Sequence, residues 1–284
     1  MAGLHVVLVC HTELDFDGSW ALYDRLQPRM EESLDRVAQA TGRRPKVTHC
    51  LTGDFLFERL EEAFRLLEAG HEIGIHSHLP GAQRRPQHSY AGHYAYRLDR
   101  QGILHQDRMA GALREVAIAA GLPAPQTHVS GMFTFQSTTI AVLERAGFCV
   151  DCSLLPGVDK NRHPACGDFV LADNVRRPDP YAYRPDRDDP WTEGNASMIE
   201  LPVSANLGGG DVAEQIASLR RRLEEGRAVD VFQSFWHHFE FADLGWTRGS
   251  FADAESFLAH CGREPLVQFS TAAEARAALE RHGL

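Results

Sequence analysis

His76 and His78 are separated by a single residue at the end of an apolar run and directly precede Leu79 and Pro80. Side chains alternate along an extended backbone, so both imidazoles are expected on the same face of a strand. Two imidazoles on one face supply half of the ligands of a typical divalent-metal site. The chain has 15 histidines, and this pair is distinguished from the others by its spacing.

A carboxylate from another part of the chain is needed to complete such a site. Glu13 and Asp15 follow the apolar run from Val6 to Cys10 near the N-terminus. One carboxylate and two imidazoles with open coordination positions form the ligand set of a metal-dependent hydrolase. The sequence therefore predicts a divalent-metal centre built from two strand ends.

Composition excludes several other classes of function. The net charge of -10 disfavours binding to nucleic acids or anionic membranes, because both attract basic surfaces. No apolar run is long enough to span a membrane, and the first residues lack the features of a secretory signal, so we expect a cytoplasmic protein. The six cysteines are irregularly spaced and do not suggest a disulfide framework.

Strand-like and helix-like segments alternate along the chain and must position these residues. About seven or eight such pairs, without a break in composition, predict a single α/β domain over residues 1–284 with a parallel sheet. A closed or nearly closed barrel fits better than a Rossmann sheet, since no glycine-rich phosphate motif follows the first strand. The expected strands are 5–10, 46–51, 72–76, 127–131, 148–153, 198–203, 229–237 and 266–269, and the expected helices are 22–40, 55–68, 107–120, 137–146, 212–225, 251–261 and 271–281.

Two further expectations concern particular segments. In the helix expected over residues 55–68, Phe57, Leu60, Phe64 and Leu67 have the spacing of a buried face. Residues 156–195 are rich in Pro, Asp and Arg and lack periodicity. We expect this long segment to cover the open end of the barrel and to determine substrate choice.

Four segments with characteristic residues follow one another over nearly the whole chain. They are His71–His78, Ala146–Ser153, Met198–Val203 and His237–Glu240. Their order and spacing resemble the motifs of the polysaccharide deacetylase superfamily (NodB homology, carbohydrate esterase 4), of which the chain is identified as a divergent member. The resemblance implies a distorted (β/α) barrel of about seven strands, and removal of acyl groups from the nitrogen of amino sugars with a bound metal ion, zinc or a similar one.

The resemblance assigns roles to the first two motifs. The first motif falls on His11, Thr12 and Glu13, which places Glu13 as a metal ligand and His11 where the family has a catalytic aspartate. A neutral histidine can accept a proton near pH 7, so His11 is the expected base. A shift of the motif by two residues would instead make Glu13 the base and Asp15 the ligand. Without such a shift, Asp15 is the competitor of His11 for the role of catalytic base.

The second and third motifs depart from the family pattern. The family histidines are usually four residues apart, but Pro80 occupies that position here, so His76 and His78 are the expected ligands. His88 and His93 are substitutes for them. The third motif lacks the arginine that orients the base in the family, because His128 is followed directly by Val129-Ser130-Gly131.

The remaining candidates would act on the substrate. The resemblance makes His237 the general acid that protonates the leaving amine, with Trp236 and Phe239 as walls of the pocket. Tyr181 and Tyr183 are candidates for stacking on a sugar, although packing within their own loop is the alternative. Glu200, in an apolar strand, is either functional or an internal salt-bridge partner.

Together these features predict a metal-dependent N-deacetylase. Polymer deacetylases are usually exported, and no export signal is recognised here, so the expected substrate is a small soluble amino sugar or glycoside. A homo-oligomer is a further possibility. The missing arginine and altered base position leave two alternatives open. One is a carbohydrate-binding relative without catalysis, and the other is hydrolysis of a different C–N bond, such as that of a ring amide.

Overall fold

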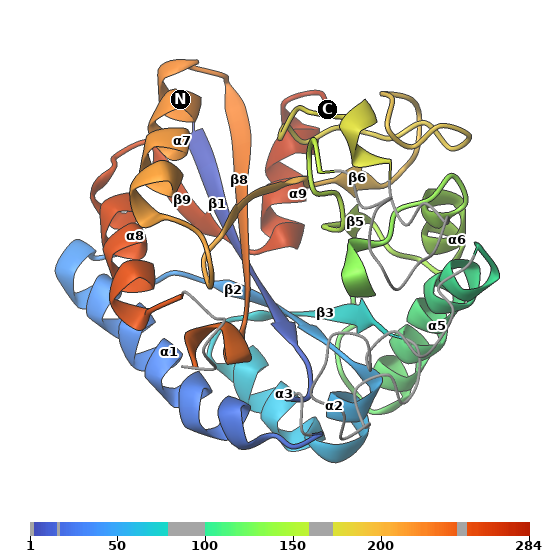
Figure 1. Cartoon of the computed structure of the whole chain (residues 1–284), viewed down its shortest axis with the longest axis horizontal. Coiled ribbons are helices and arrows are strands. Elements are labelled where there is room, and N and C mark those ends of the chain that lie inside the picture. Colours follow the sequence, from blue (N-terminus) through green and yellow to red (C-terminus); the bar gives the residue numbers. More distant parts are fainter. Residues whose placement is uncertain (1–2, 16–17, 79–99, 159–172, 243–248) are drawn as a thin grey trace.

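A parallel β-sheet curls into a distorted barrel in the computed structural model, which describes residues 3–15, 18–78, 100–158, 173–242 and 249–284 (Figure 1). The strand order is β6-β5-β4-β3-β2-β1-β8-β7, and β9 pairs with β1. Only two residues separate β6 from β7, so the two ends of the sheet are joined by a very short connection. The strands are β1 (Gly3–Thr12), β2 (Val47–Leu51), β3 (Glu72–Ser77), β4 (Thr127–Ser130), β5 (Val150–Asp151), β6 (Ile199–Glu200), β7 (Val203–Asn206), β8 (Val229–His237) and β9 (Val267–Ser270).

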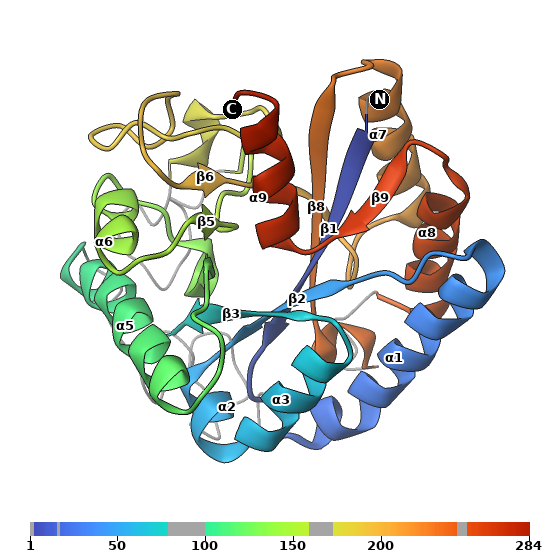
Figure 2. The ribbon, with the colours of Figure 1, turned by 180° about the vertical axis from the view of Figure 1, so that it is seen from behind.

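Most of the helices pack around the outside of this sheet, as Figures 1 and 2 show from opposite sides. The expected alternation of strands and helices and the expected barrel class are therefore confirmed, and the described residues contain nine strands in place of about seven. The α-helices are α1 (Ala21–Thr41), α2 (Gly53–Glu58), α3 (Leu60–Glu68), α5 (Arg100–Ala119), α6 (Thr139–Arg145), α7 (Val212–Glu224), α8 (Phe251–Arg263) and α9 (Ala272–Arg281), and short 3-10 helices are η1 (Gly131–Phe133), η4 (Asn174–Arg176) and η5 (His238–Phe241).

The central strand β1 is apolar on both faces because both of its faces are covered. Val6 and Leu8 pack in one cluster with residues of α1 and α8, whereas Val7 and Val9 pack in another with Val129. Parallel strands buried on both faces characteristically read as continuous apolar runs. The alternation along each strand therefore decides which side chains face the barrel interior and which face the helices.

Strand β1 also sets the position of His237. Its ten residues are long enough to pair with β8 along one edge, and with β9 and then β2 along the other. The parallel register with β8 aligns His11 with His237. Two residues from opposite ends of the sequence are thus neighbours at the carboxyl end of the sheet.

Two expected elements differ in the structure. The helix expected over residues 55–68 is broken at Arg59, whose φ of -135° is not helical, and Phe57 is 72% exposed, so its assignment to the buried face was wrong. Phe55 and Leu56 are buried there instead. The strand expected over residues 198–203 is split between β6 and β7, because Pro202 has no amide hydrogen for a ladder.

Residues 173–195, which form most of the described part of the segment that we expected to cover the open end of the barrel, lie elsewhere. Tyr181 donates a hydrogen bond to Glu225 after α7 (2.6 Å), Arg184 pairs with Glu280 of α9 (3.2 Å) and Arg187 pairs with Glu144 of α6 (2.7 Å). These carboxylates lie at the carboxyl ends of their helices, which in a parallel α/β fold meet the amino ends of the strands. The expectation is therefore wrong for these residues, and residues 159–172 lie outside the described part.

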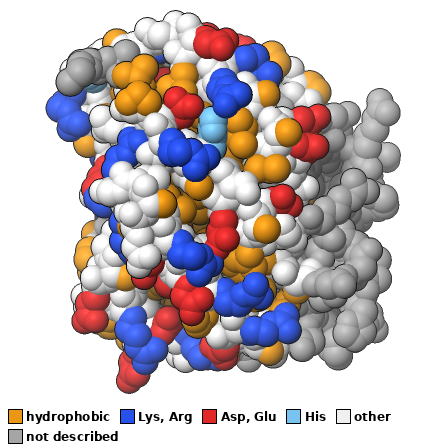
Figure 3. Space-filling model, turned by 90° about the vertical axis from the view of Figure 1, so that its left-hand side faces the viewer, with side chains coloured by type: hydrophobic (Ala, Val, Ile, Leu, Met, Phe, Trp, Pro, Cys, Tyr) orange, Lys and Arg blue, Asp and Glu red, His pale blue; other side chains and the backbone are white. Residues whose placement is uncertain are grey.

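One face of the molecule shows how its charges are distributed. On the side that lies to the left in Figure 1, acidic and basic side chains are interspersed (Figure 3). Two of the ion pairs of the molecule join Arg36 of α1 to Glu255 of α8 and Arg44 to Glu31 at 2.7 Å. Among the described residues, no helix combines the length and apolar character needed to cross a membrane.

Candidate metal centre

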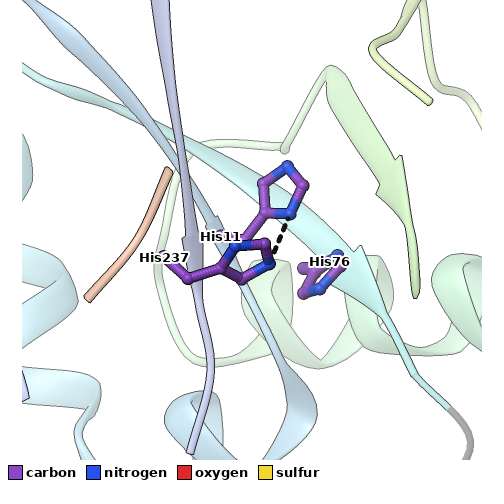
Figure 4. A group of neighbouring side chains, drawn as sticks. All are labelled: His11, His76 and His237. Atoms are coloured by element: carbon purple, nitrogen blue, oxygen red, sulfur yellow. Dashed lines mark hydrogen bonds between the residues drawn. The ribbon is translucent and has the colours of Figure 1, made fainter. Parts of the chain in front are cut away.

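The carboxyl ends of β1, β3 and β8 bring five of the predicted site residues together. Strand alternation turns these side chains inward, and Figure 4 shows the rings of His11, His76 and His237 meeting at this end of the sheet. The five residues are His11, Glu13, His76, His78 and His237.

Glu13, His76 and His78 form a three-donor group. Oε2 of Glu13 lies 3.0 Å from Nε2 of His78 and 3.4 Å from Nε2 of His76. The Nδ1 atom of His76 lies 3.1 Å from the carbonyl oxygen of Val129, which can only accept a hydrogen bond. His76 therefore carries its hydrogen on Nδ1, which leaves the Nε2 lone pair facing the carboxylate.

This group fits a divalent cation. With metal–ligand bonds of about 2.1 Å, two ligands of a tetrahedral ion lie roughly 3.4 Å apart, close to the observed separations. Nε2 of His76 is buried and has no hydrogen-bond partner. Burial and the neighbouring His78 ring lower the pKa of His76 to about 4, so the ring is neutral and able to act as a ligand at pH 7.

The carboxylate of Glu13 is ionised in this setting. Burial opposes its charge, but the imidazoles of His78 and His76 outweigh that effect and hold the pKa of Glu13 well below its usual value. Its other oxygen, Oε1, lies 3.6 Å from Nε2 of His237. Glu13 thus connects the three-donor group to the histidine of β8.

His11 and His237 form a hydrogen-bonded pair next to this group. Nδ1 of His11 lies 3.1 Å from Nε2 of His237, the contact drawn as a dashed line in Figure 4. Burial, and then the neighbouring His237 and His76 rings, lower the pKa of His11 well below its usual value. His11 is therefore neutral near pH 7, in contact with the rings of Phe133 and Phe235 at centroid distances of 5.1 and 5.2 Å.

Glu240 orients His237 from the other side. Its Oε2 lies 3.2 Å from Nδ1 of His237 and accepts the backbone amide of the same residue at 2.7 Å. Its Oε1 accepts a hydrogen bond from the side chain of Asn206 at 2.9 Å. Burial opposes a positive charge on His237, but the Glu240 carboxylate outweighs it and raises the pKa of His237 above its usual value.

Sequence reasoning did not single out Glu240 or Gly131. Glu240 lies in a segment that had been recognised, and its spacing of three residues from His237 is the signal that was available, since it forms a capping box at η5. Gly131 has a steric role, because a Cβ atom there would lie 2.7 Å from the carbonyl oxygen of Ser77 and 2.8 Å from the His78 ring. No sequence pattern reveals that contact.

Asp15 and Trp236 are not brought to the centre. Oδ2 of Asp15 accepts hydrogen bonds from the amide of Leu22 at 2.7 Å and from the hydroxyl of Ser19 at 3.3 Å, which fixes the chain before α1. Trp236 is fully buried with Met30 in the cluster between the sheet and the helices. It occupies the face of β8 opposite to His237, so its assignment to the pocket wall was wrong.

The two tyrosines also lie away from the centre. The ring of Tyr181 is 4.2 Å from the guanidinium of Arg222 and 3.6 Å from that of Arg227, at the amino end of β8. Tyr183 is fully buried and donates a hydrogen bond to the carbonyl of Pro190 at 2.6 Å. Packing within the loop is therefore correct for Tyr183, whereas Tyr181 packs against Arg222 of α7 and Arg227. His88 and His93 lie outside the described residues.

A separate group, Glu31, His49 and His71, has donor atoms within 4.8 Å of one another but does not fit a cation. The amide of Val47 donates to Nδ1 of His71 at 3.1 Å, so the hydrogen of the neutral ring is on Nε2. That Nε2 faces the Glu31 carboxylate at 3.2 Å and donates to it. An ordinary hydrogen bond therefore accounts for the contact.

Comparison with known proteins places the fold. No protein-family model matches the chain, and no curated protein matches it in sequence. A probable polysaccharide deacetylase from Pseudomonas aeruginosa PAO1 superposes with a TM-score of 0.60 at 13% identity, covering 99% of this chain and 92% of that one. A candidate polysaccharide deacetylase from Mycobacterium smegmatis gives 0.56 at 15% identity, covering 100% and 95%.

A protein with another named activity shares the same architecture. The allantoinase PuuE superposes with a TM-score of 0.57 at 14% identity, covering 99% of this chain and 92% of that chain. At these identities the similarity is one of fold. The resemblance found in the sequence motifs is thus confirmed at that level: the chain has the distorted barrel of the polysaccharide deacetylases.

Proposed function

We propose that this protein is a metal-dependent amide hydrolase that removes an N-acyl group from a small soluble amino sugar or glycoside. The observation that carries the proposal is the three-donor group of Glu13, His76 and His78 beside the His11–His237 pair. A ligand group and a proton-transfer pair side by side are what amide hydrolysis requires.

Glu13, His76 and His78 would hold the cation. The donor atoms of His11, His76 and His237 also lie within 4.8 Å of one another. We favour the group containing Glu13, because its carboxylate neutralises part of the charge of the ion, whereas His11 and His237 already bond to each other. Two imidazoles and one carboxylate favour zinc among the common divalent metals. When bound, the ion would supply Lewis acidity to the scissile carbonyl and to a water molecule.

His11 and His237 would move the protons. His11 is neutral and buried, as a general base must be to accept a proton from water. His237, whose pKa is raised by Glu240, would donate a proton to the leaving amine. Because the two rings are hydrogen-bonded, a proton taken up by one can be passed to the other across 3.1 Å.

Metal analysis followed by an activity screen tests the proposal. Protein purified without chelators should contain close to one equivalent of zinc, and the His76→Ala variant should lose most of it. The loaded protein should release acetate or formate from N-acetyl or N-formyl sugars, and the His237→Ala variant should do so roughly a hundredfold more slowly. Full retention of metal in both His76→Ala and His78→Ala would contradict the assignment of the ligands.

The same experiment separates two other functions. A carbohydrate-binding protein without catalysis would bind sugars but release no acid, with or without added metal. Hydrolysis of another C–N bond is the second candidate, because the allantoinase PuuE has the same fold. A metal-containing protein that is inactive on N-acyl sugars but releases product from ring amides would support it.

We also propose that the protein is cytoplasmic. Fractionation of the source cells tests this location.

A further inference from the structure

Ser77 lies between His76 and His78 in the sequence, but its side chain points to the opposite face of β3. Strand alternation sends both histidines into the barrel interior and the Ser77 hydroxyl toward the helices. Oγ of Ser77 lies 2.8 Å from Nε2 of His128 on the neighbouring strand β4. Both residues are fully buried.

His128 connects Ser77 to the next strand. Nδ1 of His128 lies 2.7 Å from Oδ1 of Asp151 on β5, and a carboxylate can only accept, so Nδ1 carries a hydrogen. The same oxygen accepts the Ser153 hydroxyl at 2.8 Å, and the Ser153 oxygen accepts the amide of Ser130 at 2.8 Å. Side-chain bonds therefore tie together three adjacent strands behind the metal-binding face.

Glu200 of β6 extends this connection. It is aligned with Asp151 in the parallel register, and one oxygen of each carboxyl, Oδ2 of Asp151 and Oε2 of Glu200, is buried without a hydrogen-bond partner. Burial and the Asp151 carboxylate raise the pKa of Glu200 well above its usual value. This shift favours the protonated form of Glu200, which avoids two adjacent negative charges.

The hydrogen bonds link a hydroxyl (Ser77) to an imidazole (His128) and then to a carboxylate (Asp151), as in the catalytic triad of serine hydrolases. These three residues nevertheless cannot act as a catalytic triad. All three side chains are fully buried between the sheet and the helices, and a nucleophile must reach its substrate. A buried, satisfied network of hydrogen bonds instead makes the strands that it links more rigid.

We propose that Ser77, His128 and Asp151 are positioning residues that fix the separation of His76 and His78. The proposal rests on the proposed function, in which these two histidines hold the cation. The link acts on β3 from its outer face, while the bond from His76 to the Val129 carbonyl acts from the inner face. Together these two hydrogen bonds hold the carboxyl end of β3 against β4, one from each face of the sheet.

The test compares Ser77→Ala with Ser33→Ala, a matched removal of a buried hydroxyl on α1 that bonds to Arg29 and Glu255. Zinc affinity is measured by competition with a chelator, and the ligand geometry is followed by the visible absorption of bound Co²⁺. Ser77→Ala should weaken zinc binding about 10- to 100-fold and alter the Co²⁺ spectrum. Ser33→Ala should leave both unchanged, and His128→Gln should reproduce the effect of Ser77→Ala.

A purely structural role would give a different result. In that case Ser77→Ala and His128→Gln would lower the unfolding temperature of the metal-free protein but keep the zinc affinity and Co²⁺ spectrum of the wild type, which would overturn the proposal. If the wild-type protein itself bound no zinc, the proposed function would fail and this inference with it. The two failures are therefore distinguishable.

Discussion

The Nδ1 atom of His11 lies 3.1 Å from the Nε2 atom of His237, although the two residues are 226 positions apart in the chain. The parallel pairing of β1 with β8 aligns them in register and creates the contact. His11 is driven toward its neutral form by burial, whereas Glu240 favours the charged form of His237. The pair therefore combines a proton acceptor and a proton donor in one hydrogen-bonded unit.

His237→Ala should lower turnover roughly a hundredfold or more while metal binding is retained, because the leaving amine loses its proton donor. His238→Ala is the neighbouring control. Nε2 of His238 lies 2.8 Å from Oε1 of Gln27, between the sheet and the helices, so this change should cost stability but leave the turnover of the folded protein intact. Turnover and metal content of both variants check the prediction, and loss of turnover only in His238→Ala would reverse the assignment.

Glu240→Gln should move the alkaline limb of kcat/KM to lower pH. The Glu240 carboxylate raises the pKa of His237 despite its burial, so removing the charge lowers that pKa, and the donor loses its proton at a lower pH. Glu274→Gln is a matched control, because Glu274 forms an equivalent capping box at α9, away from the centre. A pH profile that shifts equally in both variants, or in neither, would argue against a role for Glu240.

Glu13→Ala should abolish most metal binding, whereas Asp15→Ala should retain it. Asp15 accepts the amide of Leu22, so its loss should instead lower the free energy of unfolding by about 1–3 kcal/mol. Metal content and urea denaturation of the two variants provide the measurement. Retention of metal in Glu13→Ala with loss in Asp15→Ala would show that the ligand motif is shifted by two residues.

Gly131→Ala should disrupt metal binding although it adds one methyl group. The new Cβ would lie 2.8 Å from the ring of His78 and 2.7 Å from the Ser77 carbonyl oxygen, so the ligand must move. Gly3→Ala, where the Cβ would meet Gln268 at 3.5 Å, is an ordinary contact and serves as the control. Equal zinc affinities for the two variants would show that His78 can shift without loss.

Asp107→Asn should change how stability depends on pH. Burial raises the pKa of Asp107 to about 7, from 3.8 in the unfolded chain, so the folded state binds the extra proton between these values. The stability that this provides is fully present below the unfolded pKa and is lost as the pH rises through 7. Relative to Asp107→Asn, the wild type should lose about 2 to 3 kcal/mol between pH 5 and pH 8. A constant difference in urea denaturation would contradict the assignment.

The alternation of elements, the barrel class and most of the centre can be predicted from the sequence alone. Periodicity identified β8 over residues 229–237, which are its bounds in the structure, and strand alternation placed His76 and His78 on one face. These features depend on local patterns of apolar side chains and on spacing within a single strand. Such patterns are visible without knowledge of distant contacts.

Tertiary structure decided which neighbours each candidate would have. Trp236 adjoins His237 in sequence, but alternation along β8 buries it on the opposite face, and Tyr181 belongs to a segment that packs at the other end of the strands. The link from Ser77 through His128 to Asp151 joins three strands whose register no local pattern specifies. Contacts between residues far apart in the chain depend on strand order and register, which are set by the packing of the whole sheet.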